Sequence, residues 1–244
     1  MKYFKFEVIE YLVYLQIFYA VIFMYSLYDL KKYGYRISTA DYLMTSSIPW
    51  IYGVIIAPII ILFIYGINKD DMLIQYVLKH NNSRIIFVKQ CLRTLIINLV
   101  AVLYHIGSLI LWSQFYGDKF INWDKMQSEY FRRTKSVSDI SFGEFLWKYA
   151  VGMVISLCMI TLIAIIFDWL SKKIMGFAVI LIISVIDSSS IKIKLIFRGI
   201  LPKYKNIEET GTLIRGYIIG VAVIMLLFMF GCYAAKRKEY LNGT

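Results

Sequence analysis

The sequence predicts an all-α integral membrane protein with six transmembrane helices and a short cytoplasmic helix between the second and third. Of its 244 residues, 59% are hydrophobic, whereas apolar residues make up roughly 45–50% of an average soluble domain. The apolar residues also gather into long runs, and a helix needs about 20 such residues to cross a hydrocarbon core. A polar stretch lies between two of these runs, and it gives the fold its most distinctive feature.

Six runs are candidate spans, at residues 11–28, 43–67, 92–115, 145–170, 174–186 and 213–235. Five are long enough to cross with some tilt. The fifth, residues 174–186, gives a helix of only about 20 Å at 1.5 Å per residue, so it borrows polar flanking residues or stops part-way. This assignment leaves no room for a separate soluble domain, and we expect residues 1–244 to form a single transmembrane domain.

The first run differs from a cleaved signal sequence. Lys2 and Lys5 precede it, but Glu7 and Glu10 interrupt the basic region, and no pair of small residues at cleavage spacing follows. We therefore expect an uncleaved span. The three cysteines are odd in number and have no metal-ligand spacing, which is typical of small packing residues.

The basic residues favour an orientation with both termini in the cytoplasm. Short basic stretches lie directly at span ends, at residues 172–173 and 236–238, and the positive-inside rule gives most weight to such positions. The net charge of +11 is accounted for by anionic lipid on the inner leaflet. We therefore expect membrane lipid as a partner and no nucleic acid.

Between the second and third spans, residues 66–93 read GINKDDMLIQYVLKHNNSRIIFVKQCLR. Asn68 can cap a short helix, Asp70 and Asp71 suit the positive end of its dipole, and Lys79 and His80 suit the negative end. One face is then polar and the other apolar. The polar stripe is Asp71, Gln75 and Lys79, and the apolar face is Met72, Leu73, Tyr76 and Val77.

The same stretch also predicts where the short helix ends and where the next helix begins. Asn81 and Asn82 end the short helix, and Ser83 can cap the next one, which starts at Arg84 and runs into the third span. Two interpretations remain open for the short helix. It either lies on lipid headgroups at the interface or docks into a groove on a cytoplasmic partner.

The six spans, the short helix, the pair Ser83 and Arg84 followed five residues later by Lys89, and the compact fourth and fifth spans resemble a known family. They look like the permease subunits of ATP-binding-cassette exporters. The most similar branch is the small permeases of low-GC Gram-positive bacteria that export lantibiotics, bacteriocins and other membrane-active peptides or confer immunity to them. The resemblance implies one permease domain over residues 1–244, located in the cell membrane of a Gram-positive bacterium.

The resemblance also implies a mechanism and partners. The chain has no Gly-x-x-x-x-Gly-Lys-Ser/Thr phosphate-binding loop, so a separate ATPase subunit would bind ATP and Mg²⁺, and the chain itself would need no cofactor. A second permease copy or a sister permease would complete the path for the peptide substrate. The short helix would be the coupling helix that contacts the ATPase. The residues expected to couple are Asp71, Met72, Leu73, Gln75, Tyr76, Val77, Lys79, Arg84 and Lys89.

Polar residues inside the third span form a second candidate site. Asn98, His105 and Ser108 lie close to one helical face, and polar groups at membrane depth are costly and often functional. They either line a dimer seam or substrate path, or hydrogen-bond to neighbouring helices of the same chain. At the end of the fourth span, Asp168 beside Lys172 and Lys173 favours a local ion pair over proton coupling.

Other functions remain possible alternatives. The chain has two histidines, and neither has a second ligand or a third catalytic group at helical spacing, so we expect no enzyme. A stand-alone membrane protein, such as a secondary carrier or a sensor, is one alternative. A permease of the same family for a small-molecule drug or a lipid is another.

Overall fold

In the computed structural model the protein is all-α, with an isolated bridge between Arg36 and Ser128 beside the helices. The structure describes residues 13–17, 19–21, 24–25, 28, 36–69, 71, 82–115, 119–189 and 196–238. Within these residues, four helices are long and apolar enough to cross a membrane. They are Pro49–Asn68, Ser83–Gln114, Phe142–Trp169 and Thr210–Arg237. The membrane-protein class is therefore supported, while six spans remain a prediction.

The two other expected spans are not among these four. Helix α9 (Lys173–Ser188) has 16 residues, which gives about 24 Å, less than the roughly 30 Å of a hydrocarbon core. The first expected span, residues 11–28, is described only in part, and the described residues within it are helical. The short fifth span is thus found as expected, but neither segment is shown to cross.

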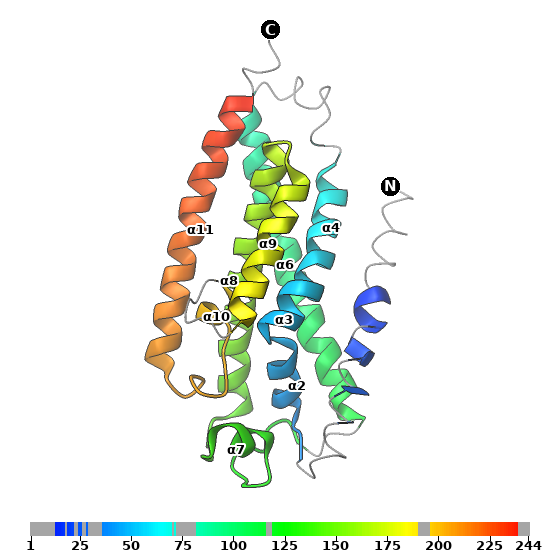
Figure 1. Ribbon diagram of the computed structural model, residues 1–244, viewed down its shortest axis with the longest axis vertical. Coiled ribbons are helices and arrows are strands. Elements are labelled where there is room, and N and C mark those ends of the chain that lie inside the picture. Colours follow the sequence, from blue (N-terminus) through cyan, green and yellow to red (C-terminus); the bar gives the residue numbers. More distant parts are fainter. Residues whose placement is uncertain are drawn as a thin grey trace.

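Helix α8 (Phe142–Trp169) is the centre of the bundle (Figure 1). In its most apolar window 67% of the residues are buried, against 39% for α6 (Ser83–Gln114) and 22% for α11 (Thr210–Lys238). Helices α6, α9 and α11 all pack against it. Because α8 has neighbours on several sides, it is apolar around its whole circumference, whereas α6 and α11 leave an apolar face uncovered.

The second expected span is broken into several pieces. It consists of α2 (Thr39–Ser46), α3 (Pro49–Ile51), the π-helical turn η1 (Tyr52–Ile56) and α4 (Ala57–Asn68). Helix α2 ends because Ile48 precedes Pro49, and the proline ring excludes the helical conformation from the residue before it. Ile48 accordingly has φ −56° and ψ 130°. The wide turn η1 comes directly before Pro58, whose missing N–H would otherwise leave a gap in a regular helix.

A close contact with α9 explains the glycine in this broken span. A Cβ at Gly53 would lie 2.2 Å from Oγ of Ser184 and 2.9 Å from the Phe197 ring. Only glycine therefore lets η1 and α9 approach so closely. Through this contact α9 packs against α3 and η1 of the second span, and Figure 1 shows α9 next to α3.

One end of the bundle, here called the α7 end, carries α7 (Glu129–Thr134) and the connection over residues 201–209, whereas α10 (Phe197–Ile200) lies part-way along the bundle (Figure 1). The buried carboxylate of Asp41 joins its parts. It accepts hydrogen bonds from N and Oγ of Ser38 at 2.8 and 2.7 Å, from Nε1 of Trp123 at 2.8 Å and from the Tyr204 hydroxyl at 3.0 Å. Residues from three separate segments therefore meet at one side chain.

The opposite end, here called the Ser83 end, holds the start of α6 and the ends of α8 and α11 (Figure 1). The predicted cap is wrong by one residue: Asn82, not Ser83, caps α6, because its Oδ1 accepts from the Arg84 N–H at 3.0 Å. Ser83 instead donates through Oγ to the carbonyl of Ala235 at 2.7 Å. This bond ties the start of α6 to the end of α11.

Candidate functional site

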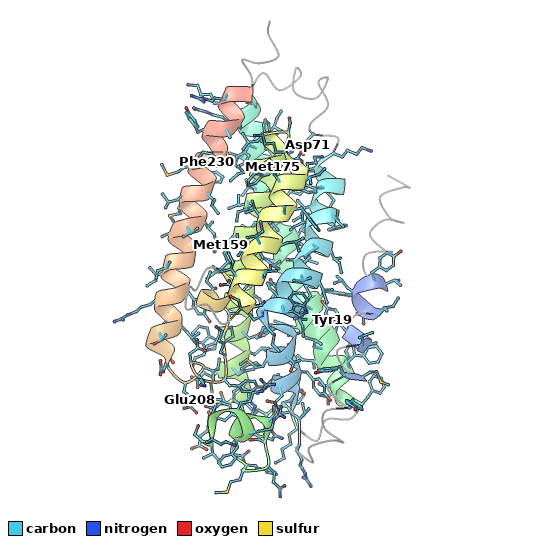
Figure 2. The ribbon with its side chains drawn as sticks, in the orientation of Figure 1. Tyr19, Asp71, Met159, Met175, Glu208 and Phe230 are labelled. Carbon is cyan, nitrogen blue, oxygen red and sulfur yellow. The ribbon has the colours of Figure 1, made fainter. Side chains whose placement is uncertain are left out.

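The coupling residues predicted from the sequence are only partly described. Met72, Leu73, Gln75, Tyr76, Val77 and Lys79 lie outside the described residues, so the short helix itself stays a prediction. Asp71, Arg84 and Lys89 are described. Arg84 and Lys89 belong to the first turns of α6, at the Ser83 end, and Figure 2 shows Asp71 at the same end. Asp71 belongs to the polar sequence between α4 and α6, residues 69–82, here called the polar connection.

Asp71 anchors the start of this polar connection to α6. Its Oδ2 lies 2.5 Å from Nη2 of Arg93 and 3.4 Å from Nε2 of Gln90. Arg93 also donates through Nη1 to the carbonyl of Ile67 at 3.3 Å. Asp71 is 7% exposed and Gln90 is fully buried. A carboxylate so far from water is stable only with such charged and polar partners.

The same hydrogen bonds continue to the central helix. Oε1 of Gln90 accepts from Nε1 of Trp169 at 2.8 Å, and Trp169 is the last residue of α8. Its ring packs edge-on against Phe87 with centroids 6.2 Å apart. A continuous path therefore runs from Asp71 through Gln90 to Trp169, here called the Asp71 network. It connects the polar connection with both α6 and α8.

Arg84 and Lys89 lie on the first two turns of α6, outside the hydrogen bonds that define the Asp71 network. Both side chains are exposed. Sequence analysis missed Gln90, Arg93 and Trp169, which hold Asp71 in place. The available signal was the spacing of Gln90 and Arg93, three residues apart at the entry of an apolar helix, together with a preceding aspartate.

The ion pair expected at the end of the fourth span is confirmed. Oδ1 of Asp168 lies 3.3 Å from Nζ of Lys173, across the turn between α8 and α9. Lys173 also lies over the Tyr65 ring at 5.4 Å from its centroid. Ser171 has φ 58° in this turn, the left-handed conformation that closes many helix ends.

His105 lies inside the helix bundle and is 2% exposed. Its Nδ1 is 2.8 Å from the Tyr19 hydroxyl, and its Nε2 is 2.9 Å from the Tyr149 hydroxyl and 3.1 Å from Oγ of Ser46. These partners lie on the first helical segment, α8 and α2. Figure 2 shows Tyr19 on the first segment, beside the bundle. The ring thus joins four parts of the same chain.

Asn98 and Ser108 also bond within the chain. Nδ2 of Asn98 donates to Oγ1 of Thr161 on α8 at 2.9 Å, and Oγ of Ser108 accepts from Nε2 of Gln16 at 2.8 Å. The three polar residues of the third span thus contact neighbouring helices, as one of the two alternatives expected. Whether they also line a substrate path stays a prediction.

Asn98 additionally borders an apolar groove of about 460 Å³ between α6, α8 and α11. Its lining on α6 and α8, here called the floor, includes Thr94, Asn98 and Cys158, and its lining on α11 is Ile224, Met225, Phe228 and Met229. Oδ1 of Asn98 and Oγ1 of Thr94 are buried without a hydrogen-bond partner among the described residues. The groove is therefore apolar with a small polar strip on α6.

Comparison of the chain with models of protein families, with curated proteins and with solved structures finds no match. Function must therefore be argued from the chain's own residues.

Proposed function

We propose that the chain is the membrane-spanning subunit of an exporter driven by a separate ATP-binding-cassette ATPase. The observation that carries this proposal is the Asp71 network. A segment that receives force from a partner must be linked firmly to the helices that move. Asp71 supplies such a link, because its bonds to Arg93 and Gln90, and the bond from Gln90 to Trp169, reach two helices at once.

The composition of the Ser83 end supports a partner with negative charge. Lys69, Arg84, Lys89, Lys236 and Arg237 all have exposed side chains there. Charges of one sign on a surface steer an oppositely charged partner and fix its register. Since the sequence lacks a phosphate-binding loop, the nucleotide would be bound by that partner, and the chain itself would not be catalytic.

A membrane-active peptide is the substrate class that we propose. The groove between α6, α8 and α11 offers mostly apolar lining with the hydroxyl of Thr94 and the amide of Asn98 at its floor. An amphipathic peptide has both kinds of surface. Helices α6 and α11 leave apolar faces uncovered, and a second copy of the chain or a sister subunit would close the groove from the other side.

The test is to purify the chain gently from its native membrane and to identify any ATP-binding subunit that remains attached. We expect an ATPase to copurify and its activity to respond to the chain. Asp71→Asn keeps the shape of the side chain but removes the charge that holds Arg93. It should leave the complex intact and weaken the response of the ATPase to peptide. Asp124→Asn, which changes an exposed aspartate at the α7 end, is the matched control.

Two outcomes would contradict the proposal. If no ATP-binding subunit is found under conditions that preserve the fold, the chain acts alone, as a carrier or a sensor would. If an ATPase copurifies and Asp71→Asn behaves like Asp124→Asn, the Asp71 network does not transmit force.

A further inference from the structure

At the α7 end, the break in the second span opens a hollow of about 390 Å³. This volume falls within the roughly 300–1,000 Å³ of ordinary small-ligand sites. Its apolar lining residues, here called the floor, are Met44, Ile48, Pro49 and Pro202, and its basic lining residues, here called the rim, are Arg133, Lys203 and Lys205. Thr45, Ser47 and Tyr204 complete the lining. None of the described residues that line it is acidic.

The hollow lies beside the end of an apolar helix. The helix Pro49–Asn68 has 20 residues, which gives about 30 Å, the thickness of a hydrocarbon core. We take this helix to cross the core along its full length, which puts Pro49, and with it the hollow that Pro49 lines, at the headgroup boundary. Trp50 is 53% exposed beside it, and exposed tryptophans are typical of this interface.

The basic rim is held in place by its neighbours. Nε of Arg133 donates to Oε1 of Glu129 at 2.7 Å, and its guanidinium lies 5.3 Å from the centroid of the Tyr204 ring. In the described part of the chain this contact engages only the Nε–H, so the terminal nitrogens can bind an anion. Glu129 also forms an ion pair with Arg132, and this second cation offsets the negative charge of Glu129. The backbone of Lys203 is fixed by Asn206, whose Oδ1 accepts from the Lys203 N–H at 2.6 Å.

We propose that this hollow binds the phosphate of an anionic phospholipid, with the lipid's glycerol and upper acyl chain on the apolar floor. A phosphodiester supplies the negative charge that Arg133 and Lys205 match. The apolar floor at the hydrocarbon boundary favours an amphiphile over a free anion. This site is independent of the proposed transport function and of the Asp71 network, which lies at the other end of the bundle.

The test uses the full chain purified in a neutral detergent and titrated with short-chain phosphatidylglycerol, followed by native mass spectrometry or tryptophan fluorescence. Each basic residue near an anionic lipid strengthens binding about five-fold. The double variant Arg133→Gln/Lys205→Gln should therefore bind about 25-fold more weakly. Lys119→Gln/Lys135→Gln removes the same charge at the α7 end outside the hollow and should bind like the wild type.

A second variant and two probes distinguish the possible results. Lys205 is exposed, so Lys205→Glu should fold normally and still weaken binding; unchanged binding by this variant would overturn the proposal. Phosphatidylcholine should bind more weakly than phosphatidylglycerol, and equal binding would also overturn it. Inorganic phosphate should not displace the lipid. If phosphate alone displaces it at matched concentration, the ligand is the free anion and the lipid proposal fails.

Discussion

Replacing Asp41 with alanine should weaken the fold more than any other single change at the α7 end. Asp41 is 1% exposed and accepts four hydrogen bonds from three partners. Two of the donors, the backbone N–H of Ser38 and Nε1–H of Trp123, belong to residues that are themselves buried to 99% or more. Water therefore cannot take the place of the carboxylate at these donors.

The expected cost follows from those two donors. Leaving one buried donor without an acceptor costs about 1–3 kcal/mol, so two cost about 4 kcal/mol. The Tyr204 hydroxyl is only partly buried and can bond to water, so it adds little. For a chain of this length each kcal/mol shifts the melting temperature by about 2–4 °C, and the variant should melt about 8–16 °C lower.

The assay is thermal unfolding of the purified chain in detergent, followed by tryptophan fluorescence at one fixed scan rate. The scan rate must be the same for every variant because membrane proteins often unfold irreversibly. Asp124→Ala, which removes an exposed aspartate from the same segment, is the control and should change the melting temperature little. A decrease for Asp41→Ala no larger than that of the control would refute the role assigned to Asp41.

Three further predictions use the same assay. Gly53→Ala should lower the free energy of unfolding by about 1–3 kcal/mol, because the new Cβ would collide with Ser184. Gly107 has open space around it, so Gly107→Ala is the control and should not lower stability. Equal effects of the two variants would contradict the close contact at Gly53. Burial and the Asp41 carboxylate raise the pKa of Tyr204 well above 10.0. The unfolded phenol then ionises first, so stability should fall as the pH rises above about 10, and less steeply in Tyr204→Phe. His105→Leu should lower the free energy of unfolding by about 1–3 kcal/mol, because the imidazole ring bridges three hydroxyls. An unchanged melting temperature would contradict that bridge.

Hydrophobic runs were sufficient to predict the helices that could cross a membrane. The four found in the structure correspond to expected spans, and α9 is short, as its 13-residue apolar run indicated. The break at residues 47–48 was missed because the apolar run over residues 43–67 was interpreted as one continuous span. Proline's effect on the preceding residue is local, but whether a helix bends or ends depends on its surroundings, here the contacts of Asp41 and α9.

The candidate sites were less predictable than the helices. Asp71 was singled out as part of a polar stripe, yet its partner Arg93 lies 22 positions further along the chain, and Trp169, which joins the network through Gln90, lies 98 positions further. Periodicity reports the face of one helix and carries no information on such distant contacts. For the same reason the sequence suggested Asp41 neither as a buried carboxylate nor as the partner of Trp123 and Tyr204.

The central claim is that the polar connection after α4 transmits force from a separate ATPase through Asp71. The most direct measurement is peptide-stimulated ATP hydrolysis by the complex of this chain with its ATPase in proteoliposomes, compared between wild type, Asp71→Asn and Asp124→Asn. We predict that all three complexes assemble and that only Asp71→Asn loses most of the stimulation. Full stimulation in Asp71→Asn, or the absence of any associated ATPase, would contradict the claim.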